Sequence, residues 1–401
     1  MNRVLPHFGL VPGGPRFAAE AGGGVTAANA PDAILVGATI SVTGPSSGEV
    51  RPLKKMMESW AEMVNMKGGI HLKGYGKALP LKFIMYDDCS KPEESARLYE
   101  KLVIQDKVHL LLGPYLSSMT VEASAMAEKH QIPFIAAEAN ASALFQRGFK
   151  WLVGALDRSV KWSHHYFDLI KAGGKAKTIA FIVEEIPQRK EVVAGAIPRA
   201  KEIGLRVVAE EYFSSSAQDL TPIINKVKAA SPDIVYVSAR PAQEITVHRQ
   251  ALQHGLNPRE FHYLEPGAVF REAVGLKAAN LVTGVSYWMP GVKGGPNVGE
   301  FKELLKRSGI TVEDYSWAPV RFFAFELLRA GLEKAGTLDS GRLMATLRGL
   351  AIISISGSLK IDPTTGQGSR SPFPIQIQDG KYVTLWPPVY ATGKHIYPRP
   401  Q

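Results

Sequence analysis

Leu110-Leu111-Leu112-Gly113-Pro114-Tyr115-Leu116-Ser117-Ser118-Met119-Thr120 is the stretch of this sequence that says most about its fold. Residues 108–112 form a mostly apolar run, as is typical of a parallel strand buried on both faces. The Gly-Pro pair predicts a turn, and Ser117 and Ser118 then open a helix-like run. This order places backbone N–H groups without helical partners, and two hydroxyls, at the carboxyl end of a strand, where open α/β sheets bind ligands. We therefore expect both serines to bind an anionic group, the alternative being that they only cap the helix.

Strand-like and helix-like segments alternate along the chain in two successive series. The expected strands of the first series are residues 34–40, 81–86, 108–112 and 132–136. Those of the second series are residues 178–183, 207–211, 234–237, 262–264 and 281–285. Helical spacing separates these strands and returns late in the chain, at residues 298–308, 318–335 and 340–350. Two series of this kind predict an α/β fold with two doubly wound, Rossmann-like lobes.

The late return to helices indicates that the chain passes between the lobes more than once. Candidate crossings lie at residues 153–155, 287–290 and 356–358. Several connectors between two lobes would act as a hinge, with a ligand cleft between the lobes. The expected division is a signal-like or disordered segment at residues 1–31, lobe 1 at residues 32–153 plus 288–355, and lobe 2 at residues 154–287 plus 356–401.

The composition is that of a globular protein with room for two domain cores. The chain has 401 residues, of which 45% are hydrophobic and 21% charged, and its formal net charge is +10. Its Lys and Arg residues are scattered, without a basic stripe interleaved with aromatic residues, so we expect no nucleic-acid partner. Cys89 is the single cysteine, which excludes an internal disulfide. No apolar run approaches the roughly 18 residues that a membrane-spanning helix needs.

The first 30 residues differ in composition from the rest of the chain, being rich in Gly, Ala and Pro. Ala28-Asn29-Ala30 fits the small-x-small pattern of a signal-peptidase site, and the first expected strand begins soon afterwards. Several prolines and glycines interrupt the apolar region that a signal peptide should have. We therefore expect an atypical export signal and a periplasmic or extracellular location, the alternative being a plain disordered tail.

No pattern in the chain indicates an enzyme. The turn at residues 44–48 lacks the Gly-Lys-Ser/Thr of a phosphate loop, and no Gly-x-Gly-x-x-Gly follows the first strand. Ser117 is not part of a Gly-x-Ser-x-Gly elbow. His248 and His254 are six residues apart, which does not put them on one helical face, and the two carboxylates at residues 87–88 make an incomplete cation shell. We expect no catalytic residue, no metal site and no cofactor.

Seven short motifs follow one another along the chain in a recognisable order. They are Gly37 to Gly44-Pro45, Asn65-Met66-Lys67-Gly68-Gly69-Ile70, Tyr86-Asp87-Asp88, Gly113 to Ser117-Ser118, Ile132-Pro133-Phe134-Ile135, Ser231-Pro232-Asp233-Ile234-Val235 and Val383-Thr384-Leu385-Trp386-Pro387-Pro388. In this order and spacing the chain resembles the type I periplasmic solute-binding proteins, the branch of the leucine/isoleucine/valine-binding proteins of ABC importers. The resemblance implies two similar lobes joined by a three-strand hinge, which close on a small molecule.

The resemblance also implies a function and a partner. The chain would be the extracytoplasmic substrate-binding protein of an ABC importer, and its partner would be an ABC permease in the membrane. Its ligand would be an amino acid or a related small carboxylate or amide, with an aromatic carboxylate also open. A ligand-sensing receptor or regulator of the same fold, of the amide- or urea-sensing type, is the alternative.

Ligand-binding residues of lobe 1 follow from the same resemblance. In amino-acid-binding members the ligand carboxylate sits on a Ser-Ser segment and its helix amides, which Ser117 and Ser118 match. The next family loop is often Ala-Ala-Thr, whereas this chain has Glu138, Ala139 and Asn140 there. A carboxylate at Glu138 would favour an ammonium, amide or urea-like group, the alternative being a surface carboxylate. Asn140 can donate and accept where the family has a hydroxyl.

Lobe 2 departs further from the family pattern. Many amino-acid binders have an aromatic residue after the strand at 178–183, whereas this chain has Gln188 in that segment, before a helix expected at 192–203. Arg240 follows a later strand and would face either a second anionic group or solvent. The acidic residue that clamps an α-ammonium falls near Glu265-Pro266-Gly267, so Glu265 and Gly267 complete the predicted site.

Overall fold

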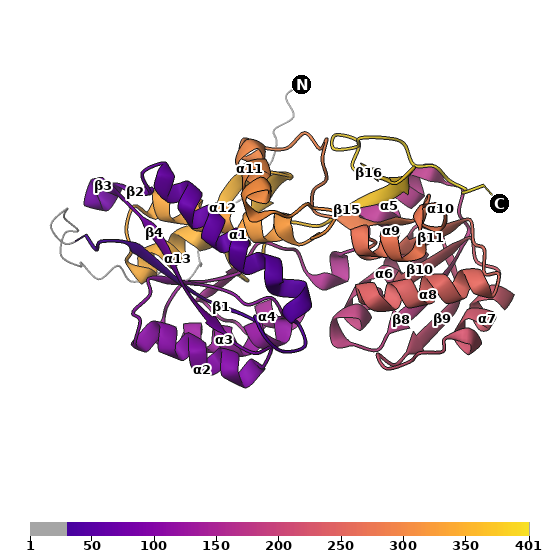
Figure 1. Cartoon of the computed structure of the whole chain (residues 1–401), viewed down its shortest axis with the longest axis horizontal. Coiled ribbons are helices and arrows are strands. Elements are labelled where there is room, and N and C mark those ends of the chain that lie inside the picture. The colour runs from indigo at the N-terminus through magenta and orange to yellow at the C-terminus, as the bar shows by residue number, and fades with distance from the viewer. Residues whose placement is uncertain (1–29, 401) are drawn as a thin grey trace, which may run out of the picture.

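Two sheets with the same strand order organise residues 30–400, the part of the chain that the computed structural model describes (Figure 1). The first sheet has the order β4-β1-β5-β6-β7. Its strands are β1 (Ile34–Ile40), β4 (Leu81–Asp87), β5 (Leu110–Leu112), β6 (Phe134–Ala136) and β7 (Leu152–Gly154). Every pairing in this sheet is parallel. The strand order reverses between β1 and β5, as in doubly wound folds.

The second sheet repeats this arrangement in the order β9-β8-β10-β11-β12, again with parallel pairing. Its parallel strands are β8 (Thr178–Glu184), β9 (Arg206–Phe213), β10 (Ile234–Ser238), β11 (Glu260–Tyr263) and β12 (Thr283–Ser286). Two antiparallel strands extend it beyond β12, namely β15 (Phe373–Gln378) and β16 (Lys381–Thr384). The predicted α/β fold with two doubly wound lobes is confirmed.

Helices connect the strands of each sheet. Those up to the first crossing are α1 (Ser47–Met66), α2 (Pro92–Ile104), α3 (Ser117–His130) and α4 (Ser142–Phe145). Those around the second sheet are α5 (His164–Gly173), α6 (Pro187–Glu202), α7 (Thr221–Ala229), α8 (Pro241–Gln253), α9 (Ala268–Val274) and α10 (Leu276–Ala279). The late helices are α11 (Val298–Ser308), α12 (Ala318–Ala335) and α13 (Ser340–Arg348).

The late helices pack beside the first sheet, although they follow the second sheet in the sequence (Figure 1). Trp60 of α1 stacks on Phe325 of α12, with ring centroids 4.3 Å apart. The indole Nε1 of Trp60 also donates a hydrogen bond to Glu300 Oε1 of α11 at 3.1 Å. We therefore use lobe 1 for the first sheet with α1–α4 and α11–α13, and lobe 2 for the second sheet with α5–α10.

The strongest sequence patterns predicted element bounds well. Strand β1 and helices α11 and α12 occupy their expected residues. Helix α6 begins at Pro187, five residues earlier than expected, because proline fits the first position of a helix. Short elements were not anticipated: the strands β7, β2 (Ile70–Leu72) and β3 (Lys77–Leu79) have three residues each, too few to show a period.

The crossings between the lobes differ from the prediction at one place. Strands β13 (Ala351–Ser354) and β14 (Gly357–Lys360) form an antiparallel hairpin, so the chain does not change lobes at residues 356–358. Gly357 lies at the turn of this hairpin and has a φ of +106°. Residues other than glycine rarely adopt this backbone conformation. The crossing lies at residues 361–372 instead. There the Arg370 N–H donates to the Ala155 carbonyl at 3.2 Å, beside the first crossing.

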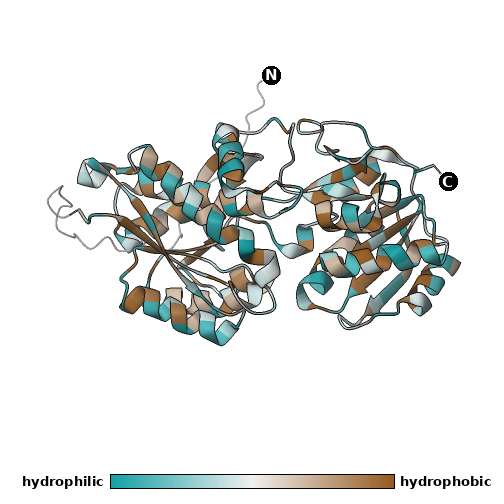
Figure 2. Ribbon diagram, in the orientation of Figure 1, coloured by the Kyte–Doolittle hydropathy of each residue, from teal (hydrophilic) through white to brown (hydrophobic). Residues whose placement is uncertain are grey.

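Each lobe has an apolar interior built from its strands and the inner faces of its helices. The strands β8 and β10, for example, are buried along almost their whole length. Figure 2 shows hydrophobic colours along the strands and hydrophilic ones on the outer surfaces of the helices. This pattern is what a parallel sheet covered on both faces requires.

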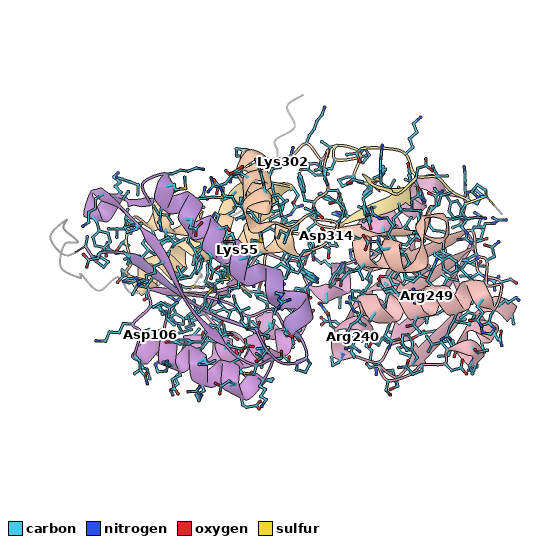
Figure 3. All side chains as sticks on the ribbon, viewed as in Figure 1. Lys55, Asp106, Arg240, Arg249, Lys302 and Asp314 are labelled. Atoms are coloured by element: carbon cyan, nitrogen blue, oxygen red, sulfur yellow. The ribbon has the colours of Figure 1, made fainter. Side chains whose placement is uncertain are left out.

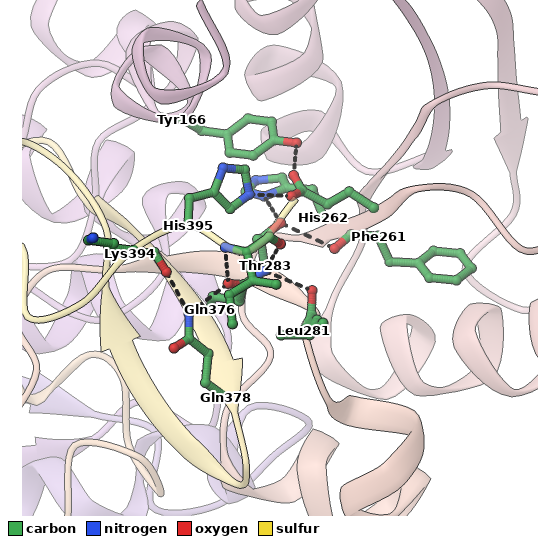
Figure 4. A network of polar contacts seen from close by, with 11 residues as sticks. Tyr166, Phe261, His262, Leu281, Thr283, Gln376, Gln378, Lys394 and His395 are labelled. Carbon is green, nitrogen blue, oxygen red and sulfur yellow. Dashed lines mark hydrogen bonds and ion pairs between the residues drawn. The ribbon is translucent and has the colours of Figure 1, made fainter. Parts of the chain in front are cut away.

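The chain beyond β16 is held against lobe 2 by polar contacts (Figure 4). The Gln376 side-chain amide donates to the Ile396 carbonyl at 3.0 Å and accepts from the Ile396 N–H at 3.0 Å. The imidazole of His395 reaches the carboxylate of Glu260, which also accepts a hydrogen bond from the Tyr166 hydroxyl at 2.6 Å. These contacts fix residues 395–396 on the surface of lobe 2.

The predicted signal-like segment falls almost entirely outside the described residues. Among the helices of residues 30–400, none is long and apolar enough to span a membrane.

Candidate functional site

A cavity of about 640 Å³ lies between the two lobes, within the size range of small-molecule sites. Its walls come from the turn before α3 in lobe 1, from the first turns of α6, α8 and α9 in lobe 2, and from residues 313–317 before α12. Strands β5, β8 and β10 lead into α3, α6 and α8, and each lies where the strand order of its sheet reverses. The cavity therefore occupies the edge at which open α/β sheets bind ligands.

The lobe 1 wall is the beginning of α3. This helix starts at Ser117 with Leu116 as its N-cap, so neither predicted serine is in the capping position. Ser117 is half-buried, Ser118 is exposed, and both line the cavity. The Thr120 N–H donates to the Leu116 carbonyl at 2.9 Å, so the helical ladder begins there and the three preceding N–H groups have no carbonyl one turn back. Together with the helix dipole, this wall favours an anion.

The lobe 2 wall is formed by the first turns of α6 and α8, each of which has a proline at its start. Gln188 and Arg189 of α6 and Arg240, the N-cap of α8, line the cavity. Figure 3 shows Arg240 at the edge of lobe 2 that faces lobe 1. Its Nε donates to Oε1 of the buried Glu184 at 2.8 Å, and its backbone N–H donates to Oε2 at 2.8 Å. The charge of Arg240 is therefore compensated inside lobe 2.

The connection between α11 and α12 contacts lobe 2 and encloses one side of the cavity. The Ala268 N–H donates to the Glu313 carbonyl at 2.8 Å. The indole Nε1 of Trp317 donates to Glu265 Oε2 at 3.1 Å. A Cβ added to Gly267 would lie 2.9 Å from the Glu313 carbonyl oxygen, so glycine permits this close approach. These contacts join the two lobes directly at the cavity.

Glu138 forms a buried, bidentate ion pair with Arg321 of α12. Arg321 Nε lies 2.8 Å from Glu138 Oε1 and its Nη2 lies 2.6 Å from Oε2. The two side chains are 2% and 1% exposed. Burial raises the pKa of Glu138 above its ordinary value, and Arg321 opposes that shift. Glu138 is therefore not a surface carboxylate, and both of its oxygens are already engaged.

Both carboxylate oxygens of Glu265, on the lobe 2 side, also accept hydrogen bonds. Its Oε1 accepts from Arg189 Nη2 at 2.8 Å, while its Oε2 accepts from Trp317 Nε1. Burial lowers the pKa of Arg189, but the carboxylates of Glu265 and Glu244 raise it, and the net shift is upward. Arg189 thus stays fully charged although it is almost completely buried.

Glu244 of α8 lies behind this pair. Its carboxylate accepts hydrogen bonds from the backbone N–H groups of Leu264 and Glu265, at 2.9 and 3.2 Å. Burial and the nearby charge of Glu265 raise the pKa of Glu244 to about 8. Glu244 is therefore mostly protonated at pH 7, which leaves one negative charge, on Glu265, beside the positive charge of Arg189.

Arg189 has spare hydrogen-bonding capacity at the cavity. Its side chain is 5% exposed, and its Nε and Nη1 have no hydrogen-bond partner among the described residues. The ring of Trp162 lies 5.8 Å from its guanidinium carbon. Buried polar groups normally have partners, so unpartnered donors in a residue that lines the cavity favour an anionic partner there.

Most of the predicted site residues meet at the cavity, and two do not. Those that line it are Ser117, Ser118, Glu138, Gln188, Arg240, Glu265 and Gly267. Ala139 and Asn140 are buried behind the wall instead. The Asn140 Nδ2 donates to the Asp157 carbonyl at 3.2 Å, and its Oδ1 accepts from the Ser159 hydroxyl at 3.0 Å. Its amide therefore holds the first crossing between the lobes, which corrects its predicted place in the ligand site.

Sequence reasoning missed Arg189 and the aromatic part of the wall. The aromatic lining consists of Tyr115, Phe270, Tyr315 and Trp317. The rings of Tyr115 and Trp317 meet edge to face, with centroids 5.8 Å apart. Pro187 is the sequence feature that could have identified Arg189. Proline favours the first position of a helix, which places Arg189 in the first turn of α6. Trp317 had no local signal, because its partner Glu265 is remote in the sequence.

The described residues contain no group of three or more His, Cys, Asp or Glu side chains that could hold a metal ion.

Comparison with known proteins agrees with this fold. A family model described as periplasmic binding protein matches residues 33–381. The chain is 24% identical to the leucine-, isoleucine-, valine-, threonine- and alanine-binding protein of Pseudomonas aeruginosa over 330 residues, which cover 80% of this chain and 85% of that protein. It is also 24% identical to a Leu/Ile/Val/Thr-binding protein of Salmonella typhimurium, with 80% and 86% covered.

Solved structures share the fold at low sequence identity. A leucine-binding protein from Thermotoga maritima superposes with a TM-score of 0.74 at 18% identity, over 88% of this chain and 98% of that one. A solute-binding protein of an ABC transporter from Rhodopseudomonas palustris, in complex with 3,4-dihydroxybenzoic acid, gives a TM-score of 0.72 at 19% identity, over 92% and 99%. These neighbours show the fold, and their ligands include both an amino-acid type and an aromatic acid.

Proposed function

This chain belongs to the periplasmic binding protein family, and we propose that it is the extracytoplasmic substrate-binding component of an ABC importer. Members of this family bind solutes and are not enzymes, as the sequence predicted. Its ligand is a small carboxylate-bearing solute, and its partner is a membrane permease. The names of the relatives, which are amino-acid-binding and ABC-transporter proteins, support import rather than ligand sensing.

The observation that carries this proposal is the cavity between the lobes, with the first turn of α3 on one wall and Arg189 on the other. The free amides and hydroxyls of α3 bind a carboxylate from the lobe 1 side. Lobe 2 then closes over the ligand by bending at the crossings. Closure removes water, which strengthens every polar contact inside, and the closed form signals occupancy to the permease.

Export completes the proposal, because an importer's receptor works outside the cytoplasm. The small-residue motif that ends at Ala30 supports cleavage shortly before β1, which begins at Ile34. Mass spectrometry of the mature protein from its native host is expected to find an N-terminus at Pro31. Retention of the full chain in the cytoplasm would argue for a sensor instead.

A thermal-shift screen of residues 31–401 tests the binding function. The panel holds branched-chain and other amino acids, short amides, urea, aliphatic acids and aromatic acids. A ligand present at a hundred times its Kd adds about 2.7 kcal/mol to the free energy of unfolding, which gives a clear shift. We expect stabilisation by at least one carboxylate. Failure of every carboxylate on the panel would contradict the proposed ligand class and, with it, the proposed function.

Replacing Ser117 and Ser118 together by alanine is expected to weaken binding of the carboxylate ligand on the order of 10- to 100-fold. Each lost hydrogen bond to a charged group contributes about 1.5–3 kcal/mol, while the backbone amides of α3 still bind. Titration calorimetry measures the change. Ser340→Ala is the matched control, because Ser340 also opens a helix but does not line the cavity. Equal affinity of the double variant and the wild type would remove the serines from the site.

A further inference from the structure

We infer that Arg189 is the lobe 2 anchor for the ligand carboxylate, and that the ligand is an apolar or aromatic carboxylate without an α-ammonium group. This inference rests on the proposed function and names the ligand class more narrowly. Three features of the cavity lead to it: the state of its carboxylates, the unused donors of Arg189 and the apolar character of its remaining wall.

The cavity lacks a buried carboxylate that is available to an ammonium group. Of the acidic residues that line it, Glu138 and Glu265 are the buried ones. Arg321 occupies both oxygens of Glu138, and Arg189 and Trp317 occupy those of Glu265. An α-ammonium placed here would lose its hydration and would have to compete with an arginine for either carboxylate. The buried charges therefore disfavour α-amino acids.

Arg189, by contrast, can accept a new anionic partner. Its Nη2 donates to Glu265, while Nε and Nη1 have no partner among the described residues. The guanidinium carries five N–H donors in a rigid plane, and those on Nε and Nη1 remain for a carboxylate. Glu265, which binds Arg189 Nη2, also accepts from Trp317 Nε1. The ring of Trp317 contacts Tyr115 of the lobe 1 wall, so the guanidinium lies near that wall.

This position lets one carboxylate meet both lobes. Tyr115 is two residues before Ser117, where the free amides of α3 begin. A carboxylate between α3 and Arg189 has four acceptor positions, enough for the α3 donors on one side and an unpartnered donor of Arg189 on the other. The anion would then hold the lobes together in the closed form.

The rest of the wall suits an apolar body. The rings of Tyr115 and Trp317 stand edge to face, and Phe270 and Val269 of α9 line the lobe 2 side. Aromatic walls bury the flat face of an aromatic ring or a branched alkyl group without requiring further polar partners. The ligand class that fits all three features is a carboxylate attached to an aromatic or branched apolar group.

Matched ligand pairs test this class directly. The first pair is 3-phenylpropionate and L-phenylalanine, and the second is 4-methylpentanoate and L-leucine. Within a pair the two compounds differ only in the α-ammonium. In calorimetric titrations of the wild-type protein we expect the ammonium-free acid of at least one pair to bind at least about 10-fold more tightly than its amino acid.

Any other result of these titrations contradicts the inference. An amino acid that binds as tightly as its ammonium-free partner shows that an ammonium site exists. If neither acid binds, the ligand is not of this class, and benzoate and 4-hydroxybenzoate are titrated to confirm that result. The proposed function would still stand in that case if any other carboxylate of the thermal-shift panel bound.

Arg189→Lys tests the anchor itself. Lysine keeps the positive charge beside Glu265, so the buried ion pair survives, but it lacks the additional Nε and Nη1 donors. We expect the acid that binds the wild type to bind this variant about 10- to 100-fold more weakly, with little change in melting temperature. Arg199→Lys is the control, because Arg199 lies on the same helix, pairs with Asp168 and does not line the cavity. Equal affinity of Arg189→Lys and the wild type would show that Arg189 does not bind the carboxylate.

Discussion

Arg321→Met is expected to lower the free energy of unfolding by about 3–5 kcal/mol at pH 7. The reason is the bidentate pair with Glu138, in which both side chains are at least 98% buried. Removing the guanidinium leaves the carboxylate in a low-dielectric interior without its two charge-assisted hydrogen bonds. The variant also removes the hydrogen bond from Arg321 Nη1 to the Gly113 carbonyl, in the turn that leads to α3. Urea denaturation followed by circular dichroism measures the loss.

Two further variants separate this charge effect from lost packing. Arg321→Met combined with Glu138→Gln leaves no unpaired charge, so it should be more stable than Arg321→Met alone. Arg307→Met is the control for removing an exposed arginine, since Arg307 pairs with Glu303 on the surface of α11, and it should cost less than about 1 kcal/mol. A loss below about 1 kcal/mol for Arg321→Met would show that the pair does not stabilise the fold.

The pH dependence of Arg321→Met provides an independent check. Burial raises the pKa of Glu138, and Arg321 opposes this, so removing Arg321 raises that pKa further. A carboxyl group whose folded-state pKa is raised binds its proton more tightly when the protein is folded. Its contribution to stability is therefore lost as the pH rises through the raised pKa. The deficit of Arg321→Met relative to the wild type should grow as the pH rises above 4.5, the ordinary pKa of a glutamate.

The fold was predictable because its determinants are local and repeated. Strand β1 and helices α11 and α12 have clear periods, and two series of such elements allow few arrangements other than two doubly wound lobes. The wall at Ser117 was predictable for the same reason: a strand, a tight turn and a helix start follow one another in the sequence. The sequence of this one short segment was therefore enough to predict the position of both serines.

The remainder of the site depends on contacts between distant segments, which local patterns do not contain. Glu138 and Arg321 are 183 residues apart, and Glu265 and Trp317 are 52 apart. The sequence showed an acidic residue in each loop, and the family resemblance suggested ammonium binding. It could not show that an arginine or an indole from another element already occupies these carboxylates. Asn140 was misplaced for the same reason, since its partners lie on the first crossing.

Local sequence patterns also could not identify Glu244, although its protonation state sets the net charge beside Arg189. A glutamate in the first turn of a helix is usually a solvated residue that complements the helix dipole. Here the carboxyl group is completely buried and lies near Glu265, and these two causes raise its pKa to about 8. Two acidic groups beside one arginine cannot all be charged at low cost, so one of them keeps its proton.

Glu244→Gln is expected to remove a large pH dependence of stability. In the wild type the folded-state pKa of about 8 lies above the ordinary value of 4.5, so the folded protein binds more protons between these values. Stability then falls by up to about 1.4 kcal/mol per pH unit as the pH rises from 5 to 8, several kcal/mol in all. Glutamine keeps the acceptor for the Leu264 and Glu265 N–H groups but does not ionise. The variant should match the wild type near pH 4.5 and exceed it at pH 8, as measured by urea denaturation at each pH.

Ionisation of Glu244 also acts on the ligand. Above pH 8 its carboxylate adds a second negative charge beside Arg189 and reduces the attraction that the cavity offers to an anion. The affinity of a carboxylate ligand should therefore fall above pH 8 in the wild type and stay level in Glu244→Gln. Glu272→Gln, at an exposed position of α9, should follow the wild type in both measurements. Parallel pH profiles for Glu244→Gln and the wild type would mean that Glu244 is already ionised at neutral pH, and that Arg189 compensates two carboxylates rather than one.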